Sequence, residues 1–111
     1  MASPYQVSAE TLRSLAFGSI SASYAAVGSA TAHGGRLICL TNDTNGDVFF
    51  SLDGVNDHFF VANGSFKLFD FTSNQRNCDQ KFELRSGTIF YVKQSTAPSA
   101  GSVYVEVIYG D

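Results

Sequence analysis

Charged side chains are scarce in this sequence, and so are the patterns that indicate a nucleic-acid or membrane protein. Asp, Glu, Lys and Arg make up 15% of the chain, against roughly 25% in an average soluble protein. The seven basic residues are scattered singly, whereas nucleic-acid binding requires clustered Lys and Arg. No apolar run approaches the ~20 residues of a membrane-spanning helix. We therefore expect no nucleic-acid or membrane partner, and the thinly charged surface suggests cover by a partner subunit.

A secretory leader and an obvious disulfide framework are also missing. The N-terminus has no basic start followed by an apolar core, so we expect a soluble protein made in a cytoplasm. Of the two cysteines, Cys39 lies in an apolar run, typical of a small buried residue, and Cys78 lies in a polar segment. A disulfide between them requires a proximity that sequence does not show. Free thiols are the favoured prediction, because nothing else indicates an oxidising compartment.

What the chain has in quantity is β-forming residues between turn residues. Ten Phe and five Tyr raise the aromatic content to 14%, and these residues favour pleated strands. Short apolar segments recur at spacings near ten residues, joined by Gly and Asn turns, and no long helical periodicity interrupts them. The length of 111 residues fits one domain. The sequence therefore predicts an all-β protein: a small antiparallel β-sandwich or jelly-roll-like domain over residues 15–111, preceded by an extended N-terminal arm over residues 1–14.

The stretch from Arg36 to Asp53 carries the strongest local signal. Two apolar runs flank Asn45-Gly46, and Asn-Gly between β-formers predicts a hairpin with a type I′ turn, in which both central residues have positive φ. Further turns are predicted at Asp53-Gly54 and Asn63-Gly64. Alternation places Val48, Phe50 and Leu52 on one face of the second strand.

Two later predicted strands, Thr88–Lys93 and Ser102–Tyr109, carry large apolar groups on both faces. In Ser102–Tyr109 the valines share one face, and in both strands the other face also holds apolar side chains. This second face needs a cover, for which a second sheet of the same sandwich and a partner subunit are about equally expected. The candidate interface residues are Leu12, Phe17, His58, Phe90, Tyr104 and Ile108.

No constellation in the sequence predicts catalysis, a metal site or a cofactor. Asp43, Asn45 and Asp47 resemble the start of a calcium loop, but the twelfth position, where an EF-hand requires Glu, is Gly54. A solvated turn is the preferred interpretation. The histidines, His33 and His58, have no Cys or acidic ligand at metal spacing, and His58 is better interpreted as a packed or interface residue. No nucleophile elbow or phosphate-binding glycine loop occurs, so we predict a protein that is not an enzyme.

A series of short motifs runs through residues 36–110. It includes an S-x-D-G motif at Ser51–Gly54, an N-D-H motif at Asn56–His58 and the G-S pair Gly64-Ser65. It continues in G-T-x-x-Y-V from Gly87 and in the segment from Pro98 through G-S-V-Y-V-x-V-I-Y-G, residues 101–110. In these motifs, residues 36–110 resemble a family of small virion structural proteins of tailed bacteriophages. The resemblance implies a multi-copy particle component made in a bacterial host. Its expected partners are copies of itself and other virion proteins, namely the major capsid protein or portal and neck proteins.

Two functions of different classes are compatible with this resemblance. The first is a non-enzymatic accessory protein, which decorates or cements the capsid or forms a collar at the head–tail neck. Its arm, residues 1–14, would lie on a neighbouring subunit, so that truncation would leave the domain folded and abolish assembly. The second is a receptor- or glycan-binding module at a tail or fibre tip, which would use polar groups such as Asn74, Gln75 and Arg76. The absence of Trp weakens this alternative.

Overall fold

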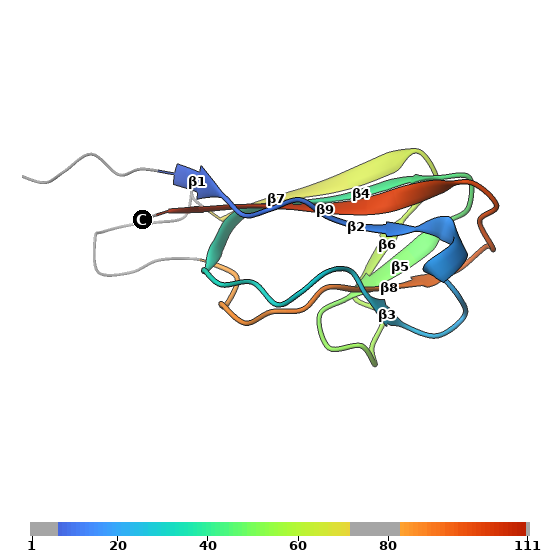
Figure 1. Cartoon of the computed structure of the whole chain (residues 1–111), viewed down its shortest axis with the longest axis horizontal. Coiled ribbons are helices and arrows are strands. Elements are labelled where there is room, and N and C mark those ends of the chain that lie inside the picture. The colour runs from blue at the N-terminus through green and yellow to red at the C-terminus, as the bar shows by residue number, and fades with distance from the viewer. Residues whose placement is uncertain (1–6, 72–82, 111) are drawn as a thin grey trace, which may run out of the picture.

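Two antiparallel β-sheets pack face to face in the computed structural model, which describes residues 7–71 and 83–110 (Figure 1). This arrangement confirms the predicted β-sandwich class. A single 3-10 turn, η1 (Phe17–Ser19), interrupts the strands of the described part of the chain. The strands are β1 (Val7–Ala9), β2 (Arg13–Ala16), β3 (Ala25–Ala26), β4 (Gly35–Thr44), β5 (Val48–Ser51), β6 (Phe59–Val61), β7 (Ser65–Asp70), β8 (Tyr91–Gln94) and β9 (Gly101–Gly110).

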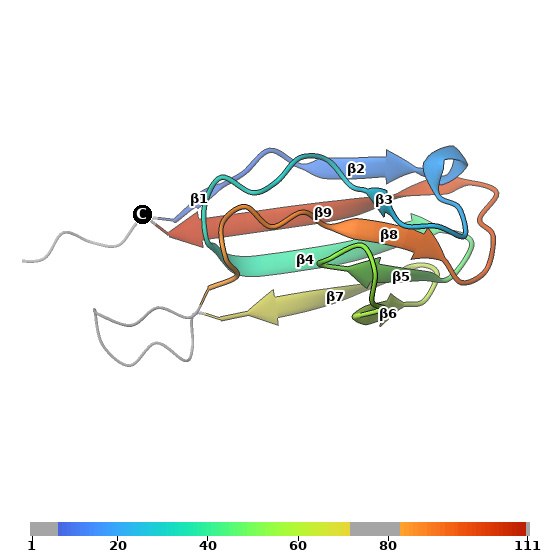
Figure 2. The same ribbon diagram turned by 90° about the horizontal axis from the view of Figure 1, so that it is seen from below.

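The larger sheet is built around β9 and β4. Its order is β1-β9-β4-β7, and β2 also pairs with β9, beyond the end of β1. The smaller sheet has the order β3-β8-β5-β6. Figure 2 shows the smaller sheet in front of one end of the longer strands, while the segments around residues 27–35 and 84–90 run across the other end. The inner face of the larger sheet is therefore covered by strands at one end and by loops at the other.

The core lies between the sheets and follows the alternation of the strands. The valines of β9, the alternate residues Ile38 and Leu40 of β4, and Phe50 of β5 are all at most 2% exposed. The remaining buried apolar side chains are Ile20, Val27, Val48, Val61, Phe90 and Val92. The predicted inward face of the Val48–Leu52 strand is confirmed for Val48 and Phe50, and the predicted valine face of residues 103–107 is confirmed as well.

The predicted hairpin at Asn45-Gly46 is wrong. The strands on either side, β4 and β5, belong to different sheets and do not pair with each other. Neither residue has positive φ. Gly46 is glycine for a different reason, since a Cβ there would lie 2.3 Å from the carbonyl oxygen of Thr96. The chain crosses between the layers here, and the side chain of Asn42 donates to the carbonyls of Gly46 (2.8 Å) and Val61 (3.0 Å) inside the turn.

Part of the segment predicted as an arm lies in the larger sheet. Residues 7–9 and 13–16 form β1 and β2, which pair antiparallel with β9. Arg13 is 8% exposed, so its side chain belongs to the folded domain. After β2, η1 separates it from β3, and these two strands lie in opposite sheets.

Two further outcomes concern single positions. The turns predicted at Asp53-Gly54 and Asn63-Gly64 are present, with φ of 76° and 71° at the glycines. Cys78, like Asn74, Gln75 and Arg76, lies outside the described residues.

Among the described residues, no helix has the length and apolar character that a membrane span requires.

Candidate interaction surface

The outward face of the larger sheet carries apolar side chains in cross-strand rows. Cys39 of β4 stands between Leu68 of β7 and Glu106 of β9. On one side of this row, Thr41 stands between Phe66 and Tyr104, and on the other side Leu37 stands between Asp70 and Ile108. Side chains in such rows are close enough to form one continuous surface. This surface is called here the outer face, and it is defined by the outward residues of β1, β2, β4, β7 and β9 together with Leu12 in the link between β1 and β2.

Large apolar side chains on the outer face are open to solvent. Phe66 is 64% exposed, Leu68 is 59% and Leu12, in the link between β1 and β2, is 52%. A groove of about 450 Å³ runs over this face and is lined almost entirely by apolar atoms. Its walls and floor are formed by Ala9, Glu10, Leu12, Leu37, Cys39, Leu68, Glu106, Val107 and Ile108. A contiguous exposed apolar patch of this kind is typical of a protein-binding surface.

The charged side chains at paired outward positions are all acidic. They are Asp43, Asp70 and Glu106, and no Lys or Arg occupies such a position in the described strands. Glu106 is exposed beside Cys39 in the groove. Within residues 7–71 and 83–110, no side chain forms a hydrogen bond or ion pair with it. The groove therefore combines an apolar floor with a carboxylate that has no partner in this part of the chain.

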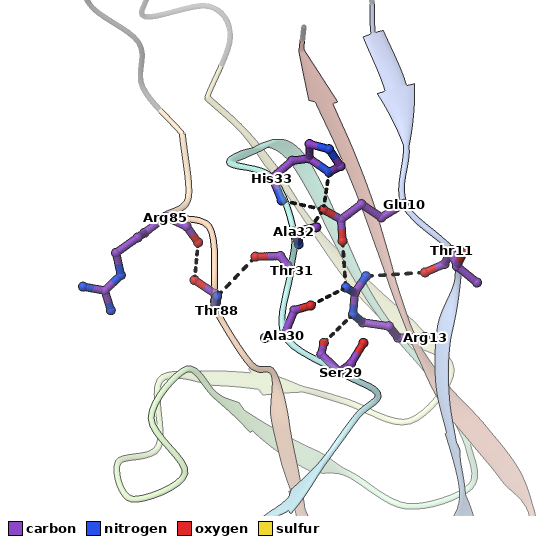
Figure 3. Close-up of polar contacts among 10 residues, drawn as sticks. All are labelled: Glu10, Thr11, Arg13, Ser29, Ala30, Thr31, Ala32, His33, Arg85 and Thr88. Carbon is purple, nitrogen blue, oxygen red and sulfur yellow. Dashed lines mark hydrogen bonds and ion pairs between the residues drawn. The ribbon is translucent and has the colours of Figure 1, made fainter.

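One wall of the groove is fixed by Arg13, which points to the inner side of the sheet (Figure 3). Its Nε donates to the carbonyl of Ser29 (2.9 Å), and its terminal nitrogens reach the carbonyls of Ala30 and Thr11. Gly28 permits this approach, because its φ is +74° and a Cβ would lie 2.7 Å from Cγ of Arg13. The guanidinium thus joins the β1–β2 segment to the loop that precedes β4.

Glu10 completes this polar cluster. Its Oε1 accepts from Arg13 at 2.7 Å, and its Oε2 accepts from the backbone amides of Ala32 (3.1 Å) and His33 (2.9 Å). The His33 ring lies 3.0 Å from the same oxygen through Nδ1 and stacks on Tyr109 with ring centroids 3.6 Å apart. Burial favours a raised pKa for Glu10, but the hydrogen bonds from Arg13 and His33 outweigh it and hold the pKa below its ordinary value of 4.5. The Glu10 carboxylate is therefore ionised, and both of its oxygens accept hydrogen bonds from groups of this chain.

The outward side of the smaller sheet is organised differently. Lys93 forms an ion pair with Asp57 (3.0 Å) and lies over the rings of Tyr24 (5.0 Å) and Phe49 (5.8 Å). Tyr24 donates to the same Asp57 carboxylate, which helps to lower the pKa of Asp57 together with Lys93. Phe49 packs edge-on against Phe60, at 5.5 Å. Charged and aromatic groups on this face therefore have partners among themselves, unlike Glu106.

The loop between β5 and β6 holds its own polar groups. The Asp53 carboxylate accepts from the amides of Asn56 and Val55, which lowers its pKa, and His58 Nδ1 accepts from the amide of Leu52 at 3.0 Å. Asp43, Asn45 and Asp47 do not converge. Asn45 exchanges hydrogen bonds with Ser99, Asp47 accepts from Asn63, and no group of three or more metal-ligating side chains occurs in the described residues.

The structure places the candidate interface residues in different surroundings. Leu12, Tyr104 and Ile108 belong to the outer face, the last two half-buried. Phe17 lies in η1 and is 38% exposed, and His58 belongs to the loop just described. Phe90, just before β8, is 1% exposed and belongs to the core rather than to an interface with a partner. Of the two covers expected for its face, the second sheet of the same sandwich is the one present.

Several outer-face residues were missed by the sequence analysis. Leu37, Cys39, Phe66 and Leu68 stand on the outward side, and Cys39 is a half-buried free thiol rather than a buried residue. The alternation in β7 already showed that Phe66 and Leu68 share one face and that Phe69 lies on the opposite face. Only the strand order of the sheet decides which of these two faces is inward. No family model, curated protein or solved structure matches the chain.

Proposed function

We propose that this protein is a non-enzymatic structural subunit of a bacteriophage particle, which attaches to other virion proteins through its outer face. The observation that carries the proposal is the exposed apolar surface formed by Phe66, Leu68 and Leu12 on the larger sheet. The assignment to a bacteriophage particle comes from the sequence resemblance to virion structural proteins. The same resemblance favours a multi-copy accessory role at the capsid surface or the head–tail neck. The partners are the major capsid protein, or portal and neck proteins, together with copies of this chain.

The energetics of the outer face support docking rather than catalysis. Complete burial of one large apolar side chain contributes roughly 1.5–3 kcal/mol, and side chains such as Phe66 and Leu68 already expose well over half of their surface. Association entropy offsets a large part of this gain, so one contact of this kind is weak. Repetition on a symmetric particle supplies avidity without further contacts.

The test is the copy number of the protein in purified particles, measured by quantitative mass spectrometry against the major capsid protein. Hundreds of copies support a capsid accessory, and about a dozen support a ring at the neck, because closed symmetry fixes these numbers. Absence from particles contradicts the proposal.

Receptor or glycan binding at a tail tip is the second proposal. The observation that favours it is the row formed by Tyr24, Lys93, Phe49 and Phe60 across the smaller sheet. Aromatic rings flanked by charged groups resemble a binding platform. A copy number of a few per particle, with a signal on a glycan array or on host cells that Phe60→Ser removes, would support this function.

A further inference from the structure

The groove on the outer face has a charge pattern that selects its occupant. Glu10 lines the groove but its carboxylate is used by Arg13 and His33, with 7% of its side chain exposed. Glu106 lines the same groove, is exposed, and has no partner among the described residues. An apolar partner laid over this groove would cover the Glu106 carboxylate and remove its water, which is unfavourable without compensation.

A second copy of this face is a poor occupant. The charges at its paired outward positions are acidic, at Asp43, Asp70 and Glu106. Packing the face against itself would place acidic side chains on both sides of the contact, and like charges across an interface weaken association. A cation on a different partner would instead convert the cost of covering Glu106 into a charge-assisted hydrogen bond.

We infer that the groove binds an apolar segment of a different protein that places a Lys or Arg side chain on Glu106. The inference rests on the proposed function only for the identity of that protein as a virion neighbour. The apolar side chains of the segment would lie on Leu37, Cys39 and Ile108, between the exposed walls formed by Leu12 and Leu68. Glu106 then selects the partner and sets its position along the groove.

The test uses the whole chain and two synthetic peptides with the same apolar sequence, one with a central Lys and one with a central Glu. Binding is followed by backbone amide chemical shifts in the folded protein. We expect shifts at Leu37, Cys39 and Ile108, and a dissociation constant roughly tenfold lower for the Lys peptide at low salt. In Glu106→Gln this preference should disappear, and in Glu106→Lys it should reverse. Val55→Ser, at an exposed position of the loop between β5 and β6, is the matched control and should behave as the wild type.

Equal affinity for the two peptides, no binding of the Lys peptide, or shifts confined to the smaller sheet would overturn the inference. The particle is tested separately, with phage particles that lack this protein and are incubated with the purified chain. If the wild type does not bind these particles, the proposed function fails while the peptide result stands. If it binds and Glu106→Gln binds equally well or better, the particle partner carries no cation at this position and the inference fails.

Discussion

The ion pair between Arg13 and Glu10 shows how a weakly charged chain uses the few charges it buries. Both side chains are less than one-tenth exposed, and backbone carbonyls and amides complete their hydrogen bonding. Removing one partner of such a pair leaves the other charge buried without compensation, which costs more than the net contribution of the pair. The cluster is therefore a point at which a small change has a large effect on stability.

We expect Glu10→Gln to lower the free energy of unfolding by about 2 kcal/mol, because it leaves the Arg13 guanidinium without its anion. The pKa of Glu10 is lower in the folded state, so its contribution is present above the ordinary value of 4.5 and is lost as the pH falls below it. The free energy of unfolding in urea should therefore decrease more between pH 7 and pH 3.5 for the wild type than for the variant. An identical decrease in both proteins would contradict this role of Glu10.

Two glycines with similar φ angles allow the free-energy cost of backbone strain to be measured apart from the cost of a steric clash. Gly64 and Gly101 have φ of 71° and 93°, but an added Cβ meets nothing at Gly64 and lies 2.0 Å from the carbonyl oxygen of Asp43 at Gly101. Gly64→Ala should cost about 1 kcal/mol from strain alone. Gly101→Ala should cost more than about 2 kcal/mol in denaturant unfolding, because backbone must also move. Equal losses of stability in the two variants would show that the β9 backbone at Gly101 moves aside without a free-energy cost.

Among the elements, β1 and β2 differ most from what the sequence indicates. The sequence predicts residues 1–14 as an arm outside the domain, yet β1 and β2 pair with β9 along most of its length. The pairing exploits an edge of β9 that would otherwise be open. Arg13 and Leu15 stand opposite Val105 and Val103, on the inner side.

Removal of residues 1–9 and of residues 1–14 should therefore have different effects. The shorter deletion removes β1 and keeps Glu10 and Arg13, so we expect a folded domain with reduced stability. The longer deletion removes this ion pair and should abolish cooperative unfolding or lower the midpoint in urea severely. Circular dichroism during urea titration checks both. A fully stable protein without residues 1–14 would restore the interpretation of this segment as an independent arm.

The β4–β5 connection shows what alternation can and cannot predict. The period of two correctly separated Val48 and Phe50 from their neighbours, because side-chain direction depends on local backbone alone. It could not show that β4 and β5 enter different sheets, since pairing depends on the distant strands β7, β8 and β9. The β4 and β7 residues of the outer face were missed for the same reason: whether Phe66 or Phe69 is inward is decided by the partner strand and not by β7.

For the whole molecule, the distribution of apolar side chains separates folding from binding. Phe50 is fully buried between the sheets, whereas Leu68 is 59% exposed on the outer face. We expect Phe50→Ala to cost about 3–5 kcal/mol of stability and Leu68→Ser to cost less than about 1 kcal/mol. Thermal and denaturant unfolding of the two variants check this contrast. A loss at Leu68 as large as that at Phe50 would mean that the outer face serves folding and is not available to a partner.

The position of β9 has a consequence for when the chain can fold. β9, the last strand of the described residues, lies inside the larger sheet, between β4 on one side and β1 and β2 on the other. During synthesis, β1, β2 and β4 therefore wait without their main neighbour until residues 101–110 have left the ribosome. Contacts between distant parts of a chain form slowly. Until that moment the apolar strands are open to the wrong partners, so aggregation competes with the addition of β9 to the sheet.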